Sequence, residues 1–117
     1  MEDMAGYSLG VDIVDVPRIA RLSRQKRFLS RVFTPDEIAY CRGKKNASQH
    51  FAVRFAAKEA VYKALGDRTL SWKDLTIVND TDGKPSCRLK KAAFKGRIHL
   101  SISHSKFYAV AGAVIEA

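Results

Sequence analysis

The sequence has few of the features that mark secreted or membrane-bound proteins. Its 117 residues include two cysteines, Cys41 and Cys87, which lie far apart without metal-type spacing, so we expect reduced, partly buried thiols. No apolar run approaches the roughly 20 residues of a membrane span. Residues 1–6 lack the basic start and apolar stretch of a signal peptide. These absences predict a cytoplasmic protein without a membrane partner, and the length fits a single domain over residues 1–117.

Acidic residues are scarce relative to basic ones. Twelve Asp and Glu face 21 Lys and Arg, which gives a formal net charge of +9. Such an excess indicates partners rather than fold: nucleic acid, an anionic membrane surface, a phosphorylated cofactor or an acidic protein. Glycine-rich phosphate loops and the His-Glu-x-x-His zinc motif are also absent. Any bound phosphate is therefore expected to be held by side chains and a divalent cation.

Hydrophobic periodicity predicts a strand, then helices, then antiparallel strands. Residues 7–14 have the pattern of a strand, residues 34–43 begin like a capped helix, and residues 48–65 form a long helix ended by Gly66. Further strands are predicted at 75–78, 86–89, 98–103 and 107–115. The last is nearly all apolar, so we expect it to be buried. This order predicts an α+β fold, with an antiparallel sheet packed against the long helix.

Charged residues within apolar segments are the first candidates for a site. Asp12 lies in the first strand, where an acid is unfavourable unless it is neutralised, so it is either half-solvated or a metal ligand. Glu59 and Lys63 are four residues apart on one helix face and could form a simple exposed ion pair. The helix around them is rich in small and apolar residues, which favours a cleft instead. Arg54, Lys58 and Lys63 would then line it with positive charge suited to phosphates.

Residues 101–105 read Ser-Ile-Ser-His-Ser and end a predicted strand. Adjacent residues on a strand point to opposite faces, so Ser103 and His104 are not expected to form a nucleophile pair. No Gly-x-Ser-x-Gly elbow is present either. The segment is better interpreted as polar lining for an anion.

Four segments together carry a resemblance that none carries alone. They are Gly-Val-Asp-Ile-Val at 10–14, Phe-Thr at 33–34 with Glu37, Phe-Ala-Ala-Lys-Glu-Ala at 55–60 with Lys-Ala-Leu-Gly at 63–66, and residues 101–105. In this order they resemble the holo-[acyl-carrier-protein] synthases, the small class of 4′-phosphopantetheinyl transferases. The resemblance implies that family's α+β fold and a homotrimer with active sites between subunits. It also implies Mg²⁺-dependent transfer of phosphopantetheine from coenzyme A to a serine of an apo-acyl carrier protein, releasing adenosine 3′,5′-bisphosphate.

The resemblance also implies residue roles. Asp12 and Glu59 match the carboxylates that hold Mg²⁺ on the pyrophosphate, and Lys63 matches the lysine near the scissile bond, so Glu59 and Lys63 are the expected catalytic residues. The implied residues that bind coenzyme A are Arg54, Lys58, Lys63, Gly66, Ser103 and His104. Larger relatives have a further acid where this chain has Val14, so a water is expected to complete the metal shell. Either that water or Glu59 would accept the serine proton.

A basic stretch between Pro17 and Thr34 contains six Lys or Arg residues and no acid. Because the family's carrier proteins are acidic, we expect this stretch to dock the carrier. The predicted docking residues are Arg18, Arg24, Arg27, Phe28 as an apolar anchor, and Arg31. Basic residues three apart drift by about 60° per step around a helix. Either the helix breaks near Lys26, or only some of these residues face the partner and the rest form a solvated surface.

Two other functions are compatible with the composition. A net charge of +9 with interspersed aromatic residues permits a small nucleic-acid-binding module. No helix-turn-helix, zinc finger or RNA-binding aromatic motif is present, so we expect no nucleic-acid partner. A noncatalytic scaffold that binds coenzyme A is the third alternative, and only turnover separates it from the enzyme.

Overall fold

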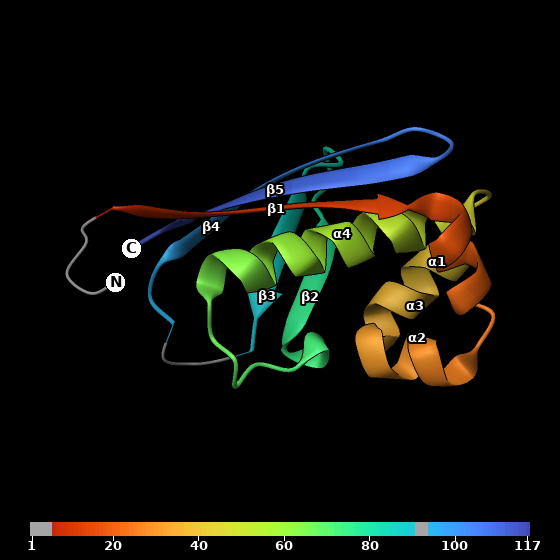
Figure 1. Cartoon of the computed structure of the whole chain (residues 1–117), viewed down its shortest axis with the longest axis horizontal. Helices are drawn as coiled ribbons and strands as arrows, with labels where there is room; N and C mark the ends of the chain where they lie inside the picture. Colours follow the sequence, from red (N-terminus) through yellow and green to blue (C-terminus); the bar gives the residue numbers. More distant parts are fainter. Residues whose placement is uncertain (1–5, 91–93) are drawn as a thin grey trace.

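The computed structural model describes residues 6–90 and 94–117, and it confirms an α+β fold with a long central helix (Figure 1). The elements follow in this order: β1 (Tyr7–Asp15), α1 (Val16–Leu22), α2 (Lys26–Val32), α3 (Pro35–Arg42), α4 (Ala47–Leu65), the 3₁₀ turn η1 (Trp72–Asp74), β2 (Leu75–Asn79), β3 (Pro85–Leu89), β4 (Arg97–His104) and β5 (Tyr108–Glu116). The three short helices gather at one end of α4.

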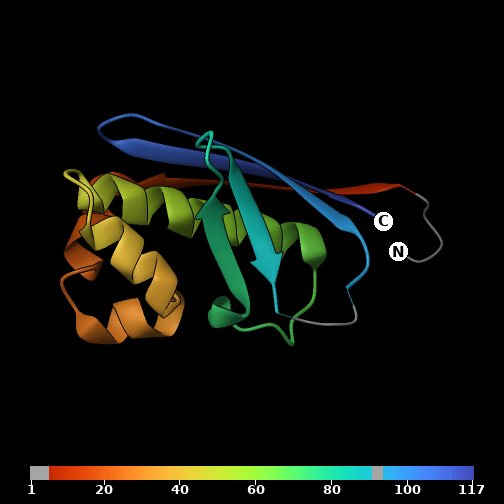
Figure 2. The same cartoon turned by 180° about the vertical axis from the view of Figure 1, so that it is seen from behind.

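Two antiparallel sheets contact α4. The larger has the strand order β1-β5-β4, with Asp12 opposite Ala111 and Ser103 opposite Val110. The smaller is the β2–β3 hairpin, which lies on another side of α4 (Figure 2). Its turn contains Gly83 at a φ of 84°, a conformation that glycine adopts without strain.

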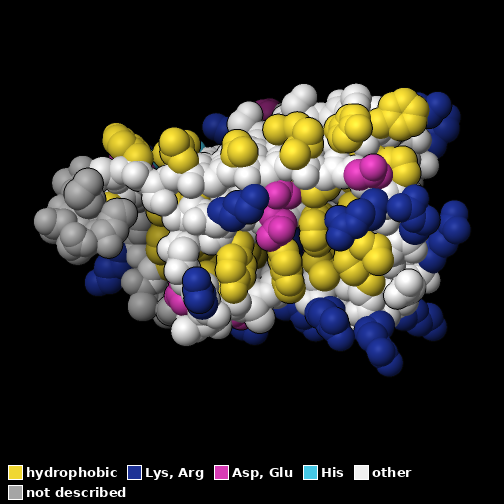
Figure 3. All heavy atoms as spheres, in the orientation of Figure 1, with side chains coloured by type: hydrophobic (Ala, Val, Ile, Leu, Met, Phe, Trp, Pro, Cys, Tyr) yellow, Lys and Arg dark blue, Asp and Glu magenta, His cyan; other side chains and the backbone are white. Residues whose placement is uncertain are grey.

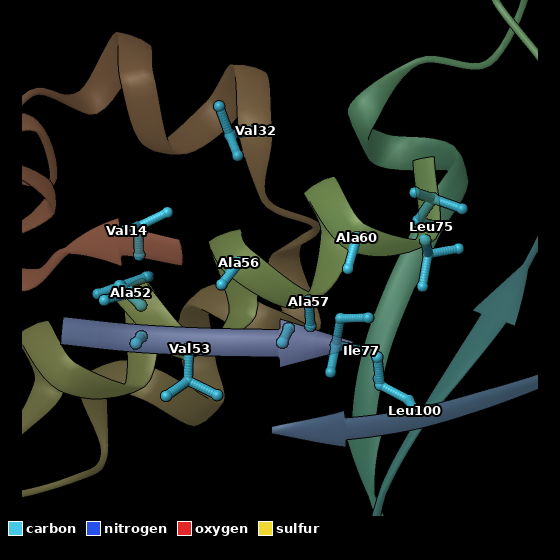
Figure 4. Packing of buried hydrophobic residues seen from close by; sticks show 14 of the residues in the cluster. Val14, Val32, Ala52, Val53, Ala56, Ala57, Ala60, Leu75, Ile77 and Leu100 are labelled. Carbon is cyan, nitrogen blue, oxygen red and sulfur yellow. The ribbon is translucent and has the colours of Figure 1, made fainter. Parts of the chain in front are cut away.

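Helix α4 forms the centre of the core because small residues cover most of its surface. Its alanines at 52, 56, 57, 60 and 64 are buried, and apolar side chains of β2 and β4 pack around them (Figure 4). The helix ends at Gly66, whose left-handed φ of 67° lets its N–H bond to the carbonyl of Tyr62. A helix packed on several sides leaves little open surface for its charged residues.

Strand β1 passes unusually close to α4. A Cβ atom added to Gly10 would lie 1.9 Å from the carbonyl oxygen of Ala60, so only glycine permits this approach. The Ser8 hydroxyl adds a 2.6 Å hydrogen bond to the carbonyl of Ala64. Alternate residues of a strand share a face, so Asp12 and Val14 face α4 together with Ser8 and Gly10.

The expectation that the last strand is buried is wrong for this chain. Burial alternates along β5 because α4 covers only one face of the sheet. On the other face Tyr108 is 53% exposed and Val110 40% exposed. This outer face continues on β1, where Tyr7, Leu9, Val11 and Ile13 are all more than 60% exposed. Figure 3 shows a row of hydrophobic side chains along this edge of the molecule.

Other sequence expectations can be compared with the described residues directly. The basic stretch forms two helices, α1 and α2, separated at residues 23–25, which confirms a break near Lys26. Cys41 and Cys87 are free thiols, the first buried and the second half-buried, also as expected. None of the helices in the described ranges has the length and apolar character that crossing a membrane requires.

Candidate functional site

Asp12 and Lys63 meet where β1 crosses α4. The Lys63 Nζ donates to Asp12 Oδ1 at 3.0 Å and to the carbonyl of Val11 at 3.1 Å. The Asp12 side chain is only 12% exposed, whereas that of Lys63 is 53% exposed. The second oxygen, Oδ2, is buried and has no hydrogen-bond partner among the described residues. A buried carboxylate oxygen without a donor is unusual, and a cation would satisfy it.

Glu59 lies one helical turn before Lys63 and is electrostatically coupled to Asp12. Burial raises the pKa of the Glu59 carboxyl above its usual 4.5, the charge of Asp12 raises it further, and Lys63 acts in the opposite direction. Two carboxylates with a single ammonium leave excess negative charge. The charge of Asp12 therefore disfavours ionisation of Glu59, a situation that a shared divalent cation relieves.

The donor set suits Mg²⁺ rather than a metal that prefers nitrogen or sulfur. No group of three or more His, Cys, Asp or Glu that could hold a metal occurs within residues 6–90 and 94–117. Asp12 and Glu59 would thus provide only two protein ligands. Mg²⁺ commonly keeps several waters and binds through one or two carboxylates together with substrate phosphates. Val14, on the same strand face, is buried and contributes no ligand.

A hollow of about 740 Å³ adjoins this group of charges. Lys63 and Gly66 both line it, together with Ser8, Leu70 and Ile115. The sequence-predicted residues Lys63 and Gly66 are thus brought together at the carboxyl end of α4. The hollow provides room beside Lys63 for part of a large ligand.

The sequence predicts that Lys58 lines a phosphate-binding cleft, but the structure places it elsewhere. Its Nζ lies 2.6 Å from Glu37 Oε1, and both side chains are 0% exposed. Arg54 is also buried: it donates to Asn79 Oδ1 at 2.5 Å and lies over the Tyr40 ring, 4.0 Å from its centre. Because α4 is packed on several sides, these two cations serve contacts within the chain rather than an open cleft.

Arg54 belongs to a second positive group that includes His104. The pKa of His50 is lowered by burial and by the positive charges of Arg54, His104 and Lys44, which shows that these groups lie near one another. His50 and Lys44 were not among the predicted residues, although His50 precedes Arg54 by four positions and so shares its helix face. Ser103 is exposed on the sheet, opposite Val110.

The two charged groups lie on different sides of α4. Arg54 and Lys63 are nine positions apart, which places them about 180° apart around the helix. Arg54 bonds to β2, whereas Lys63 bonds to β1. Within one chain, the structure therefore does not bring Arg54 and His104 together with Asp12, Glu59 and Lys63.

One of the predicted docking residues, Arg31, lies close to Glu59. The four arginines at 18, 24, 27 and 31 are exposed. Phe28 is half-buried, with its ring centre 6.1 Å from those of Phe33 and Phe55. Arg31 and Glu59 line the same hollow of about 280 Å³, together with Trp72. The basic surface and the candidate metal site are thus adjacent.

Comparison with known proteins gives a consistent result. The sequence profile of the 4′-phosphopantetheinyl transferase superfamily matches residues 8–114. The holo-[acyl-carrier-protein] synthase of Geotalea daltonii is 47% identical, covering 94% of this chain and 98% of the relative. That of Geobacter sulfurreducens is 44% identical, covering 94% and 97%.

Solved structures agree with the sequence matches. A holo-(acyl-carrier-protein) synthase from Bacillus anthracis in complex with coenzyme A (3′,5′-ADP) superposes with a TM-score of 0.84 at 36% identity, covering 94% of this chain and 96% of the other. The Helicobacter pylori synthase in complex with coenzyme A gives 0.80 at 34% identity, covering 92% and 98%. The chain belongs to the 4′-phosphopantetheinyl transferase superfamily.

Proposed function

We propose that this chain is a holo-[acyl-carrier-protein] synthase, which transfers 4′-phosphopantetheine from coenzyme A to a serine of an apo-acyl carrier protein. One observation carries the proposal: Asp12, Glu59 and Lys63 meet between β1 and α4, and Asp12 keeps a buried oxygen without a donor. Membership of the transferase superfamily and close relatives with this activity support it.

The residues of the site suit attack on a diphosphate. The serine oxygen forms a bond to the phosphorus that carries pantetheine, and the bond from that phosphorus to the bridging oxygen breaks, releasing adenosine 3′,5′-bisphosphate. Lys63 neutralises phosphate charge next to this bond. Glu59, which lies beside Asp12, or a water in the site would accept the serine proton as general base. The reaction requires positioning and charge neutralisation more than a protein nucleophile.

Mg²⁺ is the metal that the donor set favours. Asp12 and Glu59 would hold it, and the bound ion would supply Lewis-acid stabilisation of the diphosphate oxygens. The unpaired Asp12 oxygen and the mutual repulsion of the two acids support this assignment.

The exposed arginines of α1, of α2 and of the break between them are proposed to dock an acidic carrier protein. Arg24 lies in the break between α1 and α2, and Arg27 lies in the first turn of α2. Both residues are exposed. Reversing both to Glu is expected to weaken carrier binding and leave coenzyme A binding unchanged. A matched pair, Lys84→Glu and Lys90→Glu on the β2–β3 side, is the control. Unchanged carrier affinity by calorimetry would end this assignment.

The proposal includes assembly into a homotrimer and a location in the cytoplasm. A homotrimer is proposed because, within one chain, Arg54 and His104 lie on a different side of α4 from Lys63. If the exposed His104 binds a phosphate of the same coenzyme A as Lys63, a neighbouring subunit has to supply it. The apolar outer face of β1 and β5 provides a surface for that contact, and patches of this kind mark interaction sites. Leu9, 74% exposed, lies on this face and is separated by only three positions from Asp12.

Intact-mass measurement of the carrier tests the activity directly. The chain is incubated with coenzyme A, Mg²⁺ and an unmodified acidic carrier protein, and the carrier is expected to gain one phosphopantetheine. Asp12→Asn and Glu59→Gln should abolish the gain, as should EDTA, whereas Asp82→Asn in the exposed hairpin turn should not. Full activity of either site variant contradicts the assignment of the metal site.

A further inference from the structure

A buried carboxylate, that of Glu37, joins three elements at one point. The residue is 1% exposed. Its Oε1 accepts from the backbone N–H of Thr34 at 2.9 Å and from Lys58 Nζ at 2.6 Å. Its Oε2 accepts from the backbone N–H of Ile77 at 2.8 Å. The start of α3, the middle of α4 and strand β2 thus converge on one side chain.

The pair formed by Glu37 and Lys58 connects the end of α2, which carries the proposed docking residues Arg27 and Arg31, to α4, which carries Glu59. Lys58 directly precedes Glu59 on α4. Thr34 follows the end of α2 by two residues, with the fully buried Phe33 between them. The Glu37–Lys58 contact therefore lies between the end of α2 and the part of α4 that carries Glu59.

Stability alone is a poor explanation for this ion pair. Replacing a buried ion pair by apolar residues of similar volume is often neutral or stabilising, because burial of two charges is costly. Aromatic packing of Phe28 on Phe55 already attaches α2 to α4. Such packing is not directional, however, whereas a hydrogen-bonded pair fixes one arrangement.

We propose that Glu37 and Lys58 are a positioning pair, which fixes α2 relative to Glu59 so that the docked carrier presents its serine to the diphosphate. The inference rests on the proposed function. Neither residue touches a substrate. Both act through the spacing between the docking arginines and the metal-binding carboxylates.

The substitution Lys58→Met tests this role with little change of side-chain volume. It removes the link to α4 but leaves Glu37 its two backbone donors, Thr34 and Ile77. At a temperature where the variant is fully folded, we expect kcat to fall by about tenfold or more, because small displacements of reacting groups reduce rates strongly. The dissociation constants for coenzyme A and for the carrier should stay unchanged. Lys84→Met, on the exposed hairpin, is the matched control.

A kcat equal to that of the parent overturns the inference, whatever happens to the melting temperature. A weaker carrier affinity with an unchanged kcat also overturns it, because the pair would then shape only the docking surface. If Lys58→Met does not fold, the double variant Glu37→Gln/Lys58→Met removes both charges and is judged by the same criteria. Asp12→Asn is assayed in parallel: activity in that variant rejects the metal site, whereas normal Lys58→Met kinetics beside an inactive Asp12→Asn rejects only the positioning pair.

Discussion

Substitution of Gly10 by alanine is expected to damage the site without altering any charged residue. The new Cβ would lie 1.9 Å from the carbonyl oxygen of Ala60 and 2.8 Å from the backbone nitrogen of Ala64. Ordinary contacts begin at 3.4 Å, so the oxygen has to retreat by 1.5 Å, the difference between 3.4 and 1.9 Å. Both neighbouring atoms belong to the backbone of α4, so no side-chain rotation relieves the clash. Strand and helix must separate.

That separation acts on stability and on catalysis to different extents. Overpacking of this kind costs about 1–3 kcal/mol, and the Ser8–Ala64 hydrogen bond would lengthen as well. Asp12 belongs to the strand and Glu59 to the helix, so the same shift pulls the two carboxylates apart. A displacement of about 1 Å can reduce a rate by on the order of 10²-fold. We therefore expect a folded variant with a modestly lower melting temperature and a much lower transfer rate.

Initial rates from intact-mass measurements, together with Mg²⁺ affinity by calorimetry, provide the assay. Gly43→Ala is the control, because its Cβ would lie an ordinary 3.5 Å from the nearest atom. It should leave both quantities unchanged. A Gly10→Ala variant with the parent's rate and Mg²⁺ affinity would show that the close approach of β1 and α4 does not set the geometry of the site.

Three further outcomes follow from the described contacts. Mg²⁺ at ten times its dissociation constant should raise the free energy of unfolding by about 1.4 kcal/mol, measured by thermal denaturation, and Asp12→Asn should show no such increase. Without metal, the raised pKa of Glu59 means that the folded state binds this proton more tightly than the unfolded state, so the carboxyl destabilises the fold as pH rises from 4.5 through the folded pKa. Glu59→Gln should therefore have a higher melting temperature than the parent at pH 7 and lose that advantage below pH 4. A higher melting temperature that persists at low pH contradicts this reasoning. Leu9→Asp, on the outer face, should reduce the molar mass measured by light scattering, whereas an unchanged assembly would exclude that face as an interface.

The sequence was sufficient to predict the fold class because its periodicities were regular. Glycine and alanine placement identified α4 and its end at Gly66, and the capping sequence at Thr34 identified the start of α3. The predicted burial of β5 is wrong because an all-apolar strand does not indicate how many of its faces are covered. One face of its sheet packs on α4, and the other remains exposed in a single chain.

Charged residues on α4 were harder to assign than the apolar ones. The four-residue spacing of Glu59 and Lys63 and the unusual position of Asp12 indicated the site, and the structure places these three together. The same reasoning failed for Lys58, because helical spacing does not show that Glu37, 21 residues earlier, reaches its ammonium. Long-range partners of this kind arise from topology, which local patterns do not encode.

The electrostatics of the site support a role in ligand binding over one in stabilising the fold. Asp12 and Glu59 raise the free energy of the folded chain by mutual repulsion, and Asp12 buries an oxygen without a donor. Lys63 neutralises one of the two charges, yet it is half-exposed and therefore weakly held. A site that served only the fold would be more stable with one acid fewer. A divalent cation would neutralise this excess charge, and Gly10 permits the close approach of β1 and α4 that places Asp12 beside Lys63.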